Sequence, residues 1–235
     1  MAYIQCPPSW NSEHSVPGRL GHYDPYQSRV GFGQSPADAI TKAKEDGVVA
    51  LKRTIDRLEH AIHTRDRRLP IPHDVDDALA RFFKGTGFDK LEELRDRIKP
   101  LIEWLPNIPI RVIPKPVPAG TPYKSFHDVF TGHDAPGAAC PPNKCVPANN
   151  CPQGTCPAGE CTCDTGFIAL YPKWFAAANA KLQATQLIHE AFHYSYLEIL
   201  HGPSRWHDAF AYQGLVSILG GLPIGNLLNR RFPNP

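Results

Sequence analysis

Two histidines and a glutamate in the C-terminal third of the chain have the spacing of a metal site. They lie in the stretch His189-Glu190-Ala191-Phe192-His193. If this stretch is helical, His189 and His193 lie on one face, where both imidazoles can bind the same ion. Glu190 is turned by about 100° from His189, where its carboxylate can take a proton from water. The pattern predicts Zn²⁺ bound by His189 and His193, with Glu190 as the general base.

A short pattern of this kind also arises by chance, so its surroundings matter. In a chain of 235 residues with 11 histidines, composition alone produces it in about 2% of cases. The neighbouring side chains Leu187, Ile188, Phe192 and Leu197 are apolar and predict that the motif is buried. A glutamate buried between two histidines is unfavourable unless it has a chemical role. We therefore interpret the motif as a zinc site.

Hydrophobic periodicity predicts the elements that position this motif. Pro36 follows the capping residue Ser35 and favours a helix start there. Proline at position 109 and at position 114 indicates that the first predicted strand lies at a sheet edge. The predicted helices are 35–64, 74–85, 89–106 with a kink at Pro100, 176–200 with a weak point near Asn179, and 207–219; the predicted strands are 108–113, 123–130 and 166–171.

These elements predict an α+β, zincin-like fold. It has a helical N-terminal half, a small twisted sheet, an active-site helix under the sheet and a Cys-rich loop. Residues 1–34 show no periodicity and are expected to be irregular, whereas 35–235 are expected to form a single metallopeptidase domain with a Cys-rich insert at 136–164. We expect a substrate peptide to pair with the edge of the strand at 166–171.

Six of the seven cysteines lie close together among prolines, glycines and asparagines. This composition predicts a looped segment pinned by disulfides. A second zinc site is the alternative, although the paired CxxC spacing that is typical of zinc clusters is absent. Cys6 lies outside the cluster, whose members are Cys140, Cys145, Cys151, Cys156, Cys161 and Cys163.

Charge and hydropathy restrict the partners and the location. A net charge of +2 is too small for strong electrostatic attraction to nucleic acid. No apolar run is long enough for a membrane span. The start, 1–10, lacks the basic and apolar regions of an ordinary secretion signal. Because disulfides need an oxidising environment, we expect an extracytoplasmic protein, or one secreted without such a signal. An injected effector or toxin fits this pattern, and the oligomeric state is left open.

A catalytic zinc ion needs a third protein ligand, with the fourth position left for water. The candidates downstream are Glu198, His201, His207 and Asp208. Glu198 and His201 lie on the predicted helix or at its end, too near to reach back over the metal. A ligand after the turn at Gly202–Pro203 is better placed, which leaves His207 and Asp208.

The chain resembles the aspzincin metallopeptidases, the deuterolysin and lysine-specific metalloendopeptidase group, over roughly residues 36–220. The resemblance rests on the order of the elements, on the stretch 184–193 around the motif, and on an Asp followed shortly by a Tyr, here Asp208 and Tyr212. It implies that Asp208 is the third zinc ligand. It also implies that Tyr212 steadies the oxyanion of the tetrahedral intermediate.

A second resemblance favours His207 instead. His207-Asp208-Ala209-Phe210 is similar to the His-x-x-Phe of the short gluzincin-like proteases of the SprT and WLM type. That resemblance makes His207 the ligand and leaves Asp208 as an acceptor behind it. With either third ligand, Asp208 or His207, we predict a zinc endopeptidase acting on a protein or peptide substrate. The alternatives are a zinc amidohydrolase acting on cell-wall peptides and a disulfide-stapled binding module with a vestigial zinc site.

Overall fold

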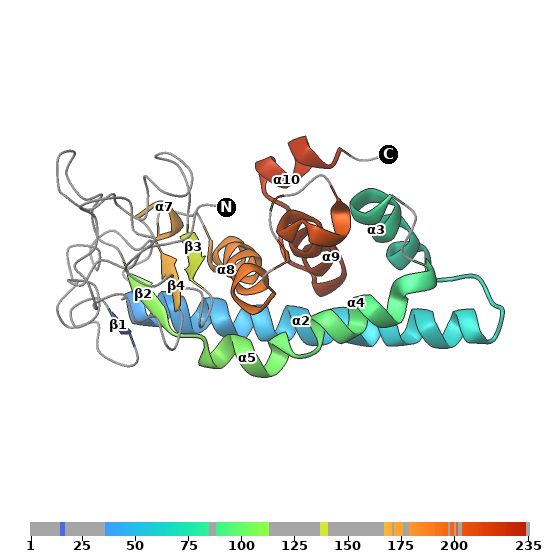
Figure 1. The fold of residues 1–235 in the computed structure, drawn as a ribbon, viewed down its shortest axis with the longest axis horizontal. Coiled ribbons are helices and arrows are strands. Elements are labelled where there is room, and N and C mark those ends of the chain that lie inside the picture. The colour runs from blue at the N-terminus through green and yellow to red at the C-terminus, as the bar shows by residue number, and fades with distance from the viewer. Residues whose placement is uncertain are drawn as a thin grey trace, which may run out of the picture. The chain divides into compact units, whose positions relative to one another are not determined.

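The computed structural model describes a mostly helical chain (Figure 1). The described residues are 15–16, 36–84, 88–112, 137–140, 167–170, 172–175, 179–196, 198–199, 201 and 204–233. The chain divides into two compact units. The first comprises 1–41, 108–178 and 193–195, and the second comprises 42–107, 179–192 and 196–235. The predicted helical character is confirmed, whereas the single domain over 35–235 stays a prediction.

The longest helix, α2 (Pro36–Asp66), begins at the predicted proline. Its apolar residues recur on one face and are buried, among them Leu51, Ile55 and Leu58. A Cβ atom at Gly47 would lie 2.8 Å from Leu105 Cδ2. Only a glycine therefore allows α2 to approach its neighbours this closely without displacing a side chain.

The next helices follow the predicted positions with one difference. They are α3 (His73–Phe83), the 3₁₀ turn η2 (Phe88–Lys90), α4 (Leu91–Ile98) and α5 (Leu101–Asn107). The predicted kinked helix over 89–106 is in fact two helices, because Pro100 has no amide hydrogen to continue the hydrogen-bond ladder. Pro106 lies inside the last turn of α5.

Two C-terminal helices complete the second unit. Helix α9 (Ala209–Gly220) packs against α3, and a Cβ at Gly214 would lie 2.2 Å from Phe82 Cε1. Helix α10 (Asn226–Arg231) lies beyond the last helix that the sequence predicted. A six-residue helix is too short to show helical periodicity. Leu228 and Phe232 are buried and anchor it.

The first unit contains four short strands and a helical turn, α7 (Pro172–Phe175). The strands are β1 (Ser15–Val16), β2 (Ile110–Val112), β3 (Gly137–Cys140) and β4 (Phe167–Leu170), in the order β1-β2-β4-β3. Strands β2 and β4 are parallel, and the outer pairs are antiparallel. The strands predicted at 108–113 and 166–171 correspond to β2 and β4, whereas β1 and β3 lie where no strand was expected.

Two strands were predicted to lie at a sheet edge, and neither of them does so in this sheet. Strand β4 pairs with β2 on one side and β3 on the other, so its backbone groups are already used and a substrate peptide cannot pair with it. Strand β2 likewise has β1 as a second neighbour. The expected edge character of 166–171 and 108–113 is therefore wrong, because β1 and β3 supply partners that periodicity did not reveal.

Several sequence predictions fall outside the described residues. Among them are the weaker strand at 123–130, the irregular course of most of 1–34, the turn at Gly202–Pro203, and the pairing of the six clustered cysteines, since the cluster beyond the backbone of Cys140 is not described. Among the described residues, no helix is long and apolar enough to cross a membrane.

Candidate metal site

The predicted motif lies on helix α8 (Ala180–Ser195). The side chain of Asn179 accepts a hydrogen bond of 2.7 Å from the backbone N–H of Leu182 and so begins the helix. The weak point predicted near Asn179 is therefore the start of α8. The helix ends at Ser195 instead of the predicted Leu200, and Tyr196 is already extended, with φ −132° and ψ 109°.

Three histidines form a group that can hold a metal ion. They are His189, His193 and His201, and their ligand atoms all lie within 4.8 Å of one another. Three nitrogen atoms at about 2.0–2.1 Å from one tetrahedral zinc lie about 3.3 Å apart, so small movements of these side chains are sufficient. His189 is buried, whereas the His201 side chain is 48% exposed. The group can therefore be reached from solvent.

The early end of α8 is what brings His201 into the group. After Ser195 the chain leaves the helix, and the Tyr196 hydroxyl donates a 2.6 Å hydrogen bond to the carbonyl of Arg97. Ile199 is fully buried, and the backbone of His201 pairs with that of Asp208 in an antiparallel bridge. We expected His201 to lie on the motif helix or at its end, too near to reach back; the structure instead places it beyond the end of α8, with its ligand atom within 4.8 Å of those of His189 and His193.

Aromatic contacts support two of the three imidazoles. The rings of His189 and His201 are stacked, with centroids 5.1 Å apart and an interplanar angle of 15°. The Phe210 ring lies 4.3 Å from the His189 ring and 4.8 Å from the His201 ring. Phe210 thus restricts the rotation of both imidazole rings, a role that the sequence analysis did not predict.

Glu190 lies next to His189 on α8 and is only 6% exposed. Burial raises the pKa of this carboxyl to about 8, because its charged form is poorly solvated there. A cation held by the neighbouring histidines would favour the carboxylate form again. The buried carboxyl group thus belongs to the residue next to His189, a member of the three-histidine group.

The structure does not place Asp208 in the three-histidine group. Its carboxylate is 1% exposed. Oδ1 accepts a 3.1 Å hydrogen bond from the backbone of Phe210 and caps α9, while Oδ2 accepts two from Arg231, at 3.2 and 2.9 Å. Burial acts to raise the pKa of Asp208, but the His201 and Arg231 side chains outweigh it and lower this pKa. Asp208 Oδ1 lies 3.9 Å from His201 Nδ1, so the carboxylate lies behind His201.

His207, the other predicted third ligand, ends the short 3₁₀ turn η4 (Arg205–His207). It is exposed and is not a member of the three-histidine group. The residue that follows this 3₁₀ turn, Asp208, caps α9.

Tyr212 is completely buried in the core of the second unit. Its ring packs against Phe83 and Phe192, at centroid distances of 5.3 and 4.8 Å. Its hydroxyl accepts a hydrogen bond from Arg97 Nη1 at 3.2 Å and donates one to the carbonyl of Trp206 at 3.1 Å. Burial raises the pKa of Tyr212. These contacts support a structural role rather than the oxyanion role that the resemblance implied.

We therefore expect Tyr212→Phe to lower the free energy of unfolding by about 1 kcal/mol, the usual net value of a lost hydrogen bond. Zinc affinity and hydrolytic turnover should stay unchanged. Urea denaturation of the metal-free chain measures the first effect, and zinc titration with an activity assay measures the others. Unchanged stability together with a loss of turnover would instead support the oxyanion role.

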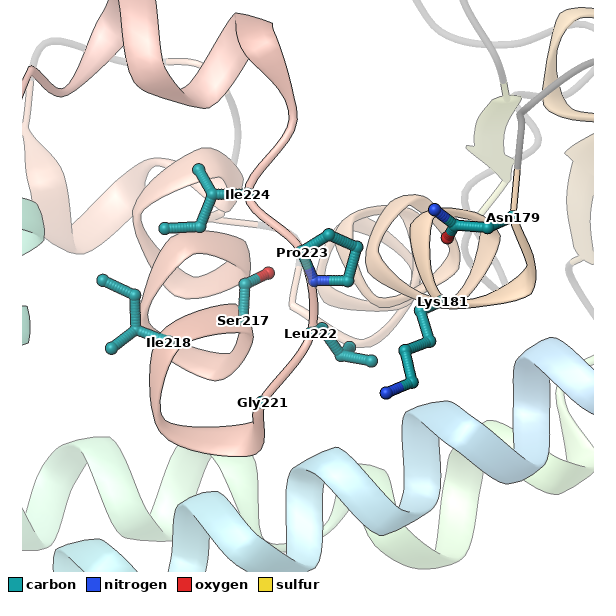
Figure 2. A pocket seen from close by; sticks show the side chains of 8 residues that line it. All are labelled: Asn179, Lys181, Ser217, Ile218, Gly221, Leu222, Pro223 and Ile224. Carbon is teal, nitrogen blue, oxygen red and sulfur yellow. The ribbon is translucent and has the colours of Figure 1, made fainter.

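The second unit also contains a pocket, which is separate from the three histidines. It lies between the N-terminal end of α8 and the segment that follows α9 (Figure 2). None of the three histidines lines it, and neither does Glu190. Its lining residues are Asn179, Lys181, Ser217, Ile218, Gly221, Leu222, Pro223 and Ile224.

Comparison with known proteins found no matching family model, no matching curated protein and no matching solved structure. The resemblance to the aspzincins therefore stays a prediction, and the function has to be argued from the site.

Proposed function

We propose that this protein is a zinc-dependent hydrolase of peptide bonds, with the metal bound by His189, His193 and His201. The observation that carries the proposal is the meeting of these three imidazoles, with the buried Glu190 next to His189 on α8. The proposal keeps the zincin motif and changes the third ligand from Asp208 or His207 to His201.

The donor set favours zinc among the common protein metals. Imidazole nitrogen is a preferred ligand of zinc, whereas magnesium and calcium prefer oxygen ligands. Catalytic zinc sites have three protein ligands and an open fourth position, and the group offers three. Zinc bound there would supply Lewis-acid activation of water and of the substrate carbonyl. The exposed His201 side chain leaves this group accessible to a substrate.

Glu190 supplies the proton transfers in this proposal. Its carboxylate takes a proton from the attacking water as the new C–O bond forms at the scissile carbonyl. The same carboxyl group then gives the proton to the amide nitrogen as the C–N bond breaks, so a neutral amine leaves. Burial of Glu190 shields these transfers from bulk water.

The test uses the full chain with one equivalent of zinc and a fluorescently labelled casein. We expect cleavage that stops when 1,10-phenanthroline removes the metal and returns when zinc is restored. Zinc binding without cleavage of any protein would contradict the proposed peptidase and favour the binding module. A chain that cleaves isolated cell-wall peptides but not casein would favour the amidohydrolase.

A further inference from the structure

The C-terminal helix α10 supplies an arginine to the carboxylate behind His201. Arg231 donates two hydrogen bonds to Asp208 Oδ2, from Nε at 3.2 Å and from Nη2 at 2.9 Å. The other carboxylate oxygen, Oδ1, lies 3.9 Å from His201 Nδ1. We infer that Arg231 and Asp208 are positioning residues that turn His201 Nδ1 toward the carboxylate and leave Nε2 for the metal. This inference rests on the proposed metal site.

The chemistry of imidazole gives this arrangement its purpose. A neutral histidine carries its proton on one ring nitrogen, and only the other nitrogen can bind a metal ion. A carboxylate that accepts a hydrogen bond from Nδ1–H fixes the tautomer in which Nε2 carries no proton. The same hydrogen bond makes Nε2 a stronger metal ligand. His201 is the most exposed of the three histidines. It therefore depends more than His189 on such a partner for its orientation.

The carboxylate is held from several directions, so it cannot turn away from His201. Its Oδ1 caps α9 through the backbone N–H of Phe210 at 3.1 Å. Its backbone is paired with that of His201 in the antiparallel bridge. Its Oδ2 accepts hydrogen bonds from Nε and Nη2 of Arg231. Rotation of the Asp208 side chain would break these hydrogen bonds inside a buried site.

Arg231 is fixed in turn by the anchoring of α10. Phe232 is 1% exposed and packs on Phe82 with a centroid distance of 5.2 Å. Arg81 of α3 donates a 2.9 Å hydrogen bond to the carbonyl of Phe232 and a 2.8 Å hydrogen bond to Asn229. These contacts lie on both sides of Arg231 in the chain. The guanidinium therefore has a defined position.

The same guanidinium supports the site by a second route. Its Cζ lies 4.9 Å from the centroid of the Phe210 ring, a distance at which a cation is attracted to an aromatic face. Phe210 contacts the rings of both His189 and His201. Loss of Arg231 therefore removes the partner of Asp208 and loosens the aromatic ring that restricts two imidazoles.

The test measures zinc dissociation constants of the full chain by competition with a chromophoric chelator. Asp208→Asn keeps an oxygen that can cap α9 but removes the charge, and Arg231→Met removes the guanidinium but keeps an apolar stem. Each should weaken zinc binding by about 10–100-fold. The loss in the double variant should be smaller than the product of the two single losses, because Arg231 acts mainly through Asp208; any loss beyond that of Asp208→Asn reports the contact of Arg231 with the Phe210 ring. Arg230→Met, at the exposed neighbouring position of α10, should bind like the wild type.

Two further readouts separate positioning from a general loss of structure. Thermal unfolding of each metal-free variant reports stability, and Arg231→Lys, which keeps one donor, should restore part of the zinc affinity. Long-range ¹H–¹⁵N spectra of the zinc-loaded chain should show one His201 tautomer in the wild type and a changed His201 signal in Asp208→Asn. Wild-type zinc binding with unchanged affinity in Asp208→Asn and Arg231→Met overturns this inference alone. A wild type that binds no zinc overturns the proposed function and this inference together.

Discussion

Glu190→Gln is expected to lower the turnover of peptide hydrolysis by about 10²–10⁴-fold, the usual loss when a general base is removed, while zinc stays bound. Glutamine has nearly the same shape as glutamate, so the buried position can accept it. It has no carboxylate to take a proton from water. Because burial already disfavours the charged form of Glu190, the change should not lower the stability of the metal-free chain.

Turnover of labelled casein by the zinc-loaded variant checks this result, together with elemental analysis for zinc. Glu198→Gln is the matched control, because Glu198 follows α8 on the same segment and its side chain is 49% exposed. It should keep wild-type turnover. Near-normal turnover in Glu190→Gln with zinc present would refute the assignment of Glu190 as the base.

The helical frame of the described part of the chain was largely readable from the sequence. Ile40, Leu51 and Leu58 recur with helical spacing and are buried on α2, and Pro36 marks its first residue. The His189 and His193 pair was predicted on a helix and lies on one. In both cases the information is local, since spacing along a few turns decides which face of the helix is apolar or ligating.

The third histidine was not predictable because no local signal ends α8 at Ser195. No glycine or proline lies between His193 and His201, so periodicity continues past the true end. The helix ends where partners distant in sequence become available. Tyr196 bonds to the carbonyl of Arg97, 99 residues away in the chain, and Ile199 becomes buried. Tertiary contacts therefore overrode the local pattern.

The role of Asp208 shows a second limit. The sequence placed a carboxylate near the motif, and the structure places it behind His201. Its partner, Arg231, lies 23 residues later on a helix that has no periodic signal. Without that arginine in view, the resemblance to the aspzincins implied that Asp208 is a ligand, with His207 as the alternative. The partner of a buried charge has to be known before its role can be assigned.

His201→Ala is the second change with a large expected effect. It removes one of three proposed ligands, so zinc affinity should fall by more than the roughly 10–100-fold that is typical of losing an outer hydrogen-bond partner. Zinc at 100 times its dissociation constant should stabilise the wild type by about 2.7 kcal/mol, and this gain should vanish in the variant. Chelator competition and thermal unfolding with and without zinc measure the two effects.

His207→Ala is the matched control for this change, since His207 is exposed and lies outside the three-histidine group. It should keep wild-type zinc affinity and the same zinc-dependent stabilisation. The comparison separates the three candidate third ligands. If Asp208→Ala removes the metal and His201→Ala does not, the ligand set is that of the aspzincins. If His207→Ala alone removes it, the second resemblance holds. Loss of zinc in His201→Ala with retention in His207→Ala establishes the three-histidine site, because His201 is the residue that the described part of the chain groups with the imidazoles of α8.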